Sequence, residues 1–308
     1  MWFVFALITM LAWGSADLFY KKGADEADRY SHLKTTMMVG VVMGIHAICM
    51  ILFTDVNYNF YNILVYLPVS VMYIASMTIG YFGLRYLELS ISSPVQNASG
   101  AVACLLCLIF LGDTMDILTS TGVILVCLGV VVLGILEKKK EDEYEALNNK
   151  KYKIGFVAFM MPILYCIIDA LGTFFDAYYL DDFNKTPLVG VTEENFENVA
   201  NISYELTFLF CAIIIFIFLK LKKQKIGIHY QGARAGAAVF ETAGQFFYVY
   251  AMSGNGAVAA PMIAAYCIVS VILSRLFLKE KLSADQYKIV AVIIAGIILI
   301  GVAEGLAG

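Results

Sequence analysis

A carboxylic acid lies in the middle of an apolar stretch of this sequence, where an ionised side chain is costly. Glu241 lies about eight residues into the segment 235–252, about 12 Å deep at 1.5 Å per helical residue. Gln245 and Tyr248 follow at helical spacing and form a polar stripe with it. An ionisable group in hydrocarbon costs roughly 2.5 to 3.5 kcal/mol on insertion scales, so Glu241 is a candidate proton-coupling residue, with Gln245 and Tyr248 as candidate binding residues. The alternative is a protonated Glu241 that only holds two helices together.

A second acid, Asp169, lies deep in the apolar segment 154–176. Tyr165 and Thr173 lie one turn to either side of it, which gives this segment one polar helical face. We expect that face to line a cavity, with Tyr165 in contact with a bound molecule and Asp169 as a coupling residue.

A third acid, Asp17, follows Trp13 at the same spacing at which Asp169 follows Tyr165. Two readings of Asp17 remain open. It is either a coupling residue, with Trp13 as a binding residue, or the partner of Lys21, four residues on, in an ion pair at the membrane edge.

Two uncharged polar residues, Gln96 and Asn97, follow Pro94 at a possible helix kink. Tyr266 lies at a matching depth after Pro261. Irregular backbone inside a membrane is tolerated where protein or water satisfies it, so these three polar residues either line a cavity or hydrogen-bond neighbouring helices.

The chemistry of these candidates favours a positively charged ligand. No Lys or Arg lies inside the apolar segments, whereas a phosphorylated or otherwise anionic metabolite needs a buried cation. Carboxylates beside Trp13, Tyr165, Tyr248 and Tyr266 suit an amine or a quaternary ammonium group, through charge pairing and cation–π contact.

Other reactive side chains give weaker signals. Asp176 and Glu205 lie close to segment ends, where we expect them at the membrane interface, and we expect His46 to be a lone packed histidine. Cys104 and Cys107, one turn apart in an apolar helix, are typical of packing. No His/Glu cluster, nucleophile motif or phosphate-binding loop is present, so we expect no enzyme activity, no metal and no cofactor.

The elements that must position these residues follow from composition. Of the 308 residues, 61% are hydrophobic and only 15% are charged, against about 25% charged in a typical soluble protein. Apolar runs of about 20 residues, the length that crosses a bilayer, recur along the chain. We therefore predict an all-α integral membrane protein with ten transmembrane helices, at 2–20, 35–53, 63–84, 91–111, 117–136, 154–176, 201–219, 235–252, 257–278 and 287–306.

The sequence also repeats itself. An ungapped shift of 167 residues superposes Pro94 on Pro261, Leu111 on Leu278, Asp113 on Glu280, Gly129 on Gly296, Gly134 on Gly301 and Glu137 on Glu304. We predict two five-helix repeats, 1–136 and 154–308, joined by a charged connector at 137–153. Since five is odd, the second repeat is inverted in the membrane relative to the first, as in many secondary transporters.

Charge predicts the orientation of the chain. Of its 21 Lys and Arg residues, only Lys185 flanks an even-numbered loop. The positive-inside rule then places the odd-numbered loops in the cytoplasm and both termini outside. The net charge of −4 is small and gives no indication of nucleic-acid binding.

Several of these motifs resemble a known family. They are Trp13-Gly14-Ser15, the Ser-Ser-Pro entry at 92–94, and the helix ends Leu111-Gly112-Asp113 and Leu278-Lys279-Glu280. Together with the Gly-rich helices that follow, they look like the drug/metabolite transporter superfamily, specifically its paired EamA domains. The resemblance implies a carrier of small organic solutes in the plasma membrane, often working outward, with helices 1, 3, 4, 6, 8 and 9 around a central cavity and helices 5 and 10 outside.

The expected function is therefore secondary active transport of a small zwitterionic or cationic metabolite by alternating access, outward and with proton coupling. A membrane scaffold or ligand sensor on the same fold is the alternative, and a channel is a third possibility. Substrate, coupling ion and oligomeric state are left open by the sequence.

Overall fold

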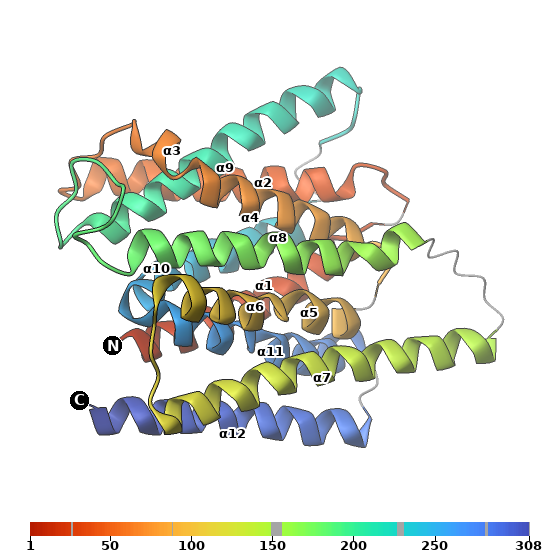
Figure 1. Cartoon of the computed structure of the whole chain (residues 1–308). Helices are drawn as coiled ribbons and strands as arrows, with labels where there is room; N and C mark the ends of the chain where they lie inside the picture. Colours follow the sequence, from red (N-terminus) through yellow and green to blue (C-terminus); the bar gives the residue numbers. More distant parts are fainter. Residues whose placement is uncertain (26, 88, 149–155, 227–230, 281–282, 308) are drawn as a thin grey trace.

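The computed structural model describes residues 1–308 except 26, 88, 149–155, 227–230, 281–282 and 308. Within the described part the chain is all helical, with no strand, as the sequence predicts. The first half forms α1 (Trp2–Gly23), α2 (Ser31–Phe53), the short α3 (Asn62–Val65), α4 (Leu67–Gly83), α5 (Leu89–Asn97), α6 (Ser99–Leu106) and α7 (Ile117–Asn148). The second half forms α8 (Phe156–Leu180), α9 (Phe196–Leu221), α10 (Gly232–Ala264), α11 (Tyr266–Leu273) and α12 (Ala284–Ala307). Both chain ends lie at the same end of the bundle (Figure 1).

The membrane spans differ from the ten separate runs expected. Among the described residues, eight helical segments are long and apolar enough to cross a membrane. One of them, Gly232–Leu278, has 47 residues and includes both expected spans 235–252 and 257–278. Since about 20 residues cross a bilayer, this segment is long enough for two crossings, and its backbone leaves the helical region at Asn255 (φ −171°, ψ 79°). Helix α4, with 17 residues, is the shorter apolar one.

One short helix in each half, α6 and α11, ends in the same way. In the first half, α6 leads into a π-helical turn, Cys107–Leu111, and then into Gly112 with a left-handed φ of 77°. In the second half, α11 leads into a π-helical turn, Ser274–Leu278, and then into Lys279 with a φ of 61°. Both helices begin directly after an interrupted position, at Ala98 and Ala265, four residues beyond Pro94 and Pro261 respectively.

The helices pack in four main pairs: α1 with α10, α4 with α8, α2 with α9, and α7 with α12. Small residues permit the close approaches, because a glycine lets two backbones meet. A Cβ on Gly122 would lie 2.8 Å from the Gly296 carbonyl oxygen, and a Cβ on Gly296 would lie 2.8 Å from the Gly122 carbonyl oxygen. Helices α7 and α12 therefore cross in direct backbone contact.

Helices α7 and α12 lie at the edge of the bundle (Figure 1) and expose apolar side chains such as Leu128 and Ile298 on their outer faces. Helix α7 continues to Asn148, so most of the connector expected at 137–153 is helical. Its last part, 149–153, lies outside the described residues. By contrast, α10 lies in the interior, and 83% of the most apolar 18-residue stretch of Gly232–Leu278 is buried inside the protein.

Candidate functional site

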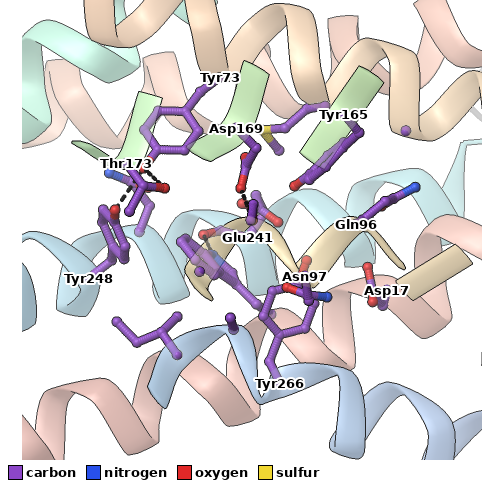
Figure 2. A pocket seen from close by; sticks show the side chains of 18 of the residues that line it. Asp17, Tyr73, Gln96, Asn97, Tyr165, Asp169, Thr173, Glu241, Tyr248 and Tyr266 are labelled. Carbon is purple, nitrogen blue, oxygen red and sulfur yellow. Dashed lines mark hydrogen bonds between the residues drawn. The ribbon is translucent and has the colours of Figure 1, made fainter. Parts of the chain in front are cut away.

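A small polar pocket lies in the interior of the bundle (Figure 2). Its volume is about 60 Å³, which is room for about four water molecules. Side chains from α1, α4, α5, α6, α8, α9, α10 and α11 line it, whereas α7 and α12 contribute none. All ten residues proposed from the sequence for binding or coupling lie in its lining: Trp13, Asp17, Gln96, Asn97, Tyr165, Asp169, Glu241, Gln245, Tyr248 and Tyr266. Their roles in binding and coupling stay predictions.

Asp17 lies within a cluster of serine hydroxyls. Its Oδ2 accepts hydrogen bonds from Ser93 Oγ at 2.7 Å and from Ser270 Oγ at 2.6 Å. The two serines come from α5 and α11, so this one carboxylate joins three helices. Lys21 Nζ points elsewhere and donates to the carbonyl oxygens of Leu84 and Leu87. The geometry thus favours the pocket reading of Asp17 over the ion pair at the membrane edge.

Asp169 has a similar environment. Ser99 Oγ donates to its Oδ2 at 2.7 Å, and Ser76 Oγ donates to its Oδ1 at 3.2 Å. These serines belong to α6 and α4, so Asp169 also joins three helices. Both aspartates are held in place by hydroxyl donors that leave their charge uncompensated.

Glu241 is held more loosely. In the part of the chain that the structure describes, its carboxylate accepts one hydrogen bond, from Tyr20 Oη at 3.2 Å. The Tyr20 ring packs on Tyr81 with 4.4 Å between ring centroids. A carboxylate with one partner keeps acceptor positions for a proton or a ligand.

Aromatic rings form one wall of the pocket. The Trp13 indole lies between Tyr248, at 5.0 Å between centroids, and Tyr266, at 5.9 Å. It also lies flat against Gly244, where a Cβ would come within 2.4 Å of Trp13 Cδ1. Gly244 is therefore required to leave room for the indole.

The second aromatic residue of the repeated spacing has a matching support. A Cβ on Gly80 of α4 would lie 2.9 Å from Cδ2 of Tyr165. The Trp13 ring thus packs on a glycine of α10, and the Tyr165 ring packs on a glycine of α4.

The amide residues of the broken helix bond to serines near them. Gln96 Nε2 donates to Ser92 Oγ at 2.7 Å, and Asn97 Nδ2 donates to the Ser93 carbonyl at 2.8 Å. These contacts are local, one turn back along the same helix, and the Asn97 side chain also lies next to Tyr266 of α11. Both side chains border the pocket, as the cavity reading of this kink requires.

Several tyrosines of the lining were missed from the sequence. Besides Tyr20 and Tyr81, they include Tyr73 and Tyr204. Tyr73 Oη is hydrogen-bonded to Thr173 Oγ1 at 2.9 Å and to Tyr248 Oη at 2.7 Å (Figure 2). A signal was present, because Tyr73, Gly80 and Tyr81 recur at helical spacing along one face of the segment 63–84.

One expectation about the other polar residues, that for His46, is wrong. Asp176 and Glu205 are buried between helices of the bundle, and their expected depth near the membrane interface stays a prediction. His46 is not a lone histidine, because its Nδ1 lies 2.8 Å from both carboxylate oxygens of Glu205. Packing of α2 on α9 brings together these two residues, which are 159 positions apart in the sequence.

The apolar helices indicate a multi-pass membrane protein, and the pocket lies in the interior of their bundle. Residues 1–135 and 204–302 match the model of the EamA-like transporter family. The chain belongs to that family, which lies within the drug/metabolite transporter superfamily that its sequence resembles. It is therefore a membrane protein of the transporter type.

Comparison with individual proteins adds the fold. No curated protein matches this chain. A solved structure described only as "Crystal structure of protein" matches with a TM-score of 0.66, over 99% of this chain and 98% of that chain. At 12% sequence identity, this likeness shows the fold alone.

Proposed function

We propose that this protein is a secondary transporter that moves a small zwitterionic or cationic organic metabolite out of the cell by alternating access, coupled to protons. One observation carries the proposal. The pocket lining contains three carboxylates, Asp17, Asp169 and Glu241, and no Lys, Arg or His among its described residues. A site of this charge attracts cations, and protons in their absence.

The aromatic wall supports the cationic substrate. Trp13, flanked by Tyr248 and Tyr266, presents the kind of ring surface that binds ammonium groups through cation–π contact. A substrate amine would contact this wall and be paired by a carboxylate opposite it. Phosphorylated metabolites have no buried cation to bind in this lining.

The size of the pocket supports alternating access. A volume of about 60 Å³ is smaller than the 300 to 1,000 Å³ typical of sites for drug-sized ligands. An organic substrate therefore needs a wider conformation of the same pocket. Such widening on one side at a time is the movement that alternating access requires.

We further propose ten membrane crossings arranged as two inverted five-helix repeats. The support is local and specific. A shift of 167 residues carries α6, its π-helical turn and the left-handed Gly112 onto α11, its π-helical turn and the left-handed Lys279, with identical boundaries. The same shift carries Gly129, which packs on Ile293, onto Gly296, which packs on Val126.

The pairing of helices supports the same arrangement. If α1, α2, α4, α5/α6 and α7 correspond in order to α8, α9, α10, α11 and α12, the pair α1/α10 exchanges with the pair α8/α4. The pairs α2/α9 and α7/α12 each map onto themselves. A two-fold axis in the membrane plane between the repeats gives this pattern. With the positive-inside rule, we propose that the odd-numbered loops face the cytoplasm of the plasma membrane.

A binding measurement tests the site without knowledge of the substrate. Trp2 and Trp13 are the two tryptophans of the sequence, so a Trp2→Phe variant leaves the Trp13 indole as a reporter in the pocket. We expect its fluorescence to respond to choline, putrescine or an amino acid, and not to a sugar phosphate. A Trp2→Phe/Asp169→Asn variant is the matched control and should bind the responding cation more weakly.

Transport is then tested in liposomes with whichever of these compounds binds. Counterflow of the radiolabelled compound supports the carrier. Binding without counterflow favours the sensor or scaffold, and single-channel currents favour a channel. A response to the sugar phosphate alone overturns the proposed substrate class.

A further inference from the structure

Asp176 is a buried acid that the pocket does not include. It lies on α8 one turn beyond Thr173, which is part of the pocket lining, and only 1% of it is exposed. We propose that Asp176 is a second proton-binding site, outside the substrate pocket, which exchanges protons with the pocket through Tyr248 and Tyr73. This inference rests on the proposed function, because it assigns part of the proton coupling to a residue.

The contacts of Asp176 leave one position for a proton. Tyr66 Oη donates a hydrogen bond to its Oδ1. Its Oδ2 is buried and has no hydrogen-bond partner among the described residues. A buried carboxylate oxygen without a donor is costly, and a proton bound at Oδ2 removes the charge that causes the cost.

Among the described residues, the surroundings of Asp176 supply no positive charge. The titratable groups that face it are Tyr66 at the start of α4, Tyr204 of α9 and Tyr248 of α10, with Asp169 two turns back on its own helix. None of these groups is cationic. Glu205 provides a contrast within the same protein, because His46 lies 2.8 Å from that equally buried acid. Glu205 therefore has a basic partner that can carry a positive charge, whereas Asp176 has hydroxyl groups.

A chain of hydroxyls joins Asp176 to the pocket. Tyr248 lies next to Asp176, and its Oη is 2.7 Å from Tyr73 Oη. Tyr73 Oη is in turn 2.9 Å from Thr173 Oγ1. Figure 2 shows Tyr73, Thr173 and Tyr248 together at one end of the pocket. Each hydroxyl both donates and accepts a hydrogen bond, so such a chain can pass a proton on.

The position along α8 indicates which side of the membrane Asp176 serves. It lies in the last part of the helix, toward the end of the bundle where both chain termini lie (Figure 1). At this end, α3 is joined to the loop that follows α8. The Asn62 side chain and the Val189 backbone form paired hydrogen bonds of 2.9 and 2.8 Å. If this end opened, water would reach Asp176 first and the deeper Asp169 afterwards.

The proton step is simple to balance. A hydronium ion at the opened end gives its proton to Asp176 Oδ2. One O–H bond of the hydronium breaks and leaves water, one O–H bond to Oδ2 forms, and the carboxylate loses its charge. For release into the pocket, that O–H bond breaks while Tyr248 accepts the proton and donates its own to Tyr73. Tyr73 donates in turn to water in the pocket, and both tyrosines are neutral before and after.

The first experiment is independent of the substrate. Difference infrared spectra of the full-length protein in liposomes, recorded between low and high pH, show each carboxylic acid that gains or loses a proton. We expect Asp176→Asn to remove one carboxylic acid band. Asp182→Asn, at a partly exposed acid paired with Lys185 in the following loop, should remove none from that buried set. An unchanged spectrum for Asp176→Asn overturns the proposal, even if the protein transports nothing.

The second experiment uses choline as the probe and compares two activities of one sample. Exchange of choline at equal pH needs no net proton movement, whereas uptake driven by a pH gradient does. We expect Asp176→Asn to keep exchange and to lose the stimulation by the gradient about tenfold, equivalent to about 1.4 kcal/mol. Full stimulation in Asp176→Asn overturns the proposal. If wild-type protein shows no exchange of choline or of the other cations, the proposed function fails, and the infrared result still decides the proton site.

Two further variants keep the inference testable if Asp176→Asn does not fold. Asp176→Glu retains an acid and should retain gradient-driven uptake. Tyr66→Phe removes the donor at Oδ1 and leaves Oδ2 free to bind a proton, so we expect stimulation to persist with a shifted pH midpoint. An unshifted midpoint in Tyr66→Phe, or loss of stimulation in Asp176→Glu with exchange intact, counts against Asp176.

Discussion

The two halves of the molecule build the same kind of acid site from different helices. In the first half, Asp17 lies one turn after Trp13, and in the second half Asp169 lies one turn after Tyr165. Each aspartate accepts hydrogen bonds from two serines on two other helices, and each aromatic ring packs on a glycine of another helix, α10 for Trp13 and α4 for Tyr165. The recurrence of the whole arrangement indicates that aromatic residue, acid and glycine belong to the scaffold of the pocket.

The difference between the halves lies three residues before the supporting glycine. In the second half this position is Glu241, before Gly244, and in the first half it is Met77, before Gly80. Both side chains line the pocket. Because the first half is built without an acid at this position, we expect Glu241 to be dispensable for the scaffold. Among the pocket residues, Glu241 is therefore the one that we expect to have a chemical role and not a packing role.

The largest expected effect on transport comes from replacing Glu241, the acid that only the second half has at this position. Glu241→Gln keeps the shape and the hydrogen bond from Tyr20 but removes the ability to bind a proton. We expect pH-driven transport in liposomes to fall about 100-fold, which corresponds to about 2.7 kcal/mol. The control is Met77→Gln at the matching position, which should cost much less. Unchanged pH-dependent transport in Glu241→Gln would remove this residue from the mechanism.

An intermediate effect comes from the two supporting glycines. Gly244→Ala places a methyl group 2.4 Å from Trp13 Cδ1, whereas Gly80→Ala places one 2.9 Å from Tyr165 Cδ2. Overpacking of an interior typically costs about 1 to 3 kcal/mol, so we expect both to lower the free energy of unfolding, Gly244→Ala more. Thermal unfolding in detergent gives the order, and a shift of Trp13 emission in a Trp2→Phe background should accompany Gly244→Ala alone. Equal costs would mean that the two aromatic residues are supported equally.

The smallest effects concern the left-handed residues after the two π-helical turns. Gly112 has open space where a Cβ would lie, so Gly112→Ala tests backbone conformation alone. A non-glycine residue in this conformation costs roughly 1 to 2 kcal/mol, and we expect Gly112→Ala to be less stable by about 1 kcal/mol. Lys279→Gly relieves the same strain in the second half and should raise the melting temperature slightly. A destabilised Lys279→Gly would show that the lysine side chain has a role that outweighs its backbone cost.

Much of this site could be predicted from the sequence, for a physical reason. Acids, amides and aromatic residues in the middle of apolar segments are costly unless they meet one another, so Glu241, Asp169 and Tyr266 indicated a shared interior. The serine partners of Asp17 could not be predicted in the same way. Ser93 and Ser270 are small residues that are common in membrane helices, and only the packing of α1, α5 and α11 brings them to Asp17.

The burial of two acids near segment ends could not be predicted from the sequence. Glu205 and Asp176 lie close to the ends of the apolar runs, yet helices α9 and α8 extend beyond residues 219 and 176, and packing against neighbouring helices buries both acids within the bundle. The number of spans stays a prediction. The run across Asn255 has no charged residue, and the two expected helices lie in one apolar segment of 47 residues whose backbone leaves the helical region at Asn255.

The backbone contact between Gly122 and Gly296 has a mechanical consequence. Helices α7 and α12 belong to different halves, and at this crossing they are already as close as two helices can come. Sliding of α7 along α12 would bring backbone atoms into collision. Separation of the two helices would leave a cavity between Gly122 and Gly296, which have no side chains to fill it. If the halves move against each other as proposed, we expect them to rotate about this contact. A larger side chain at either glycine should then hinder the motion and leave the distant ligand contacts intact.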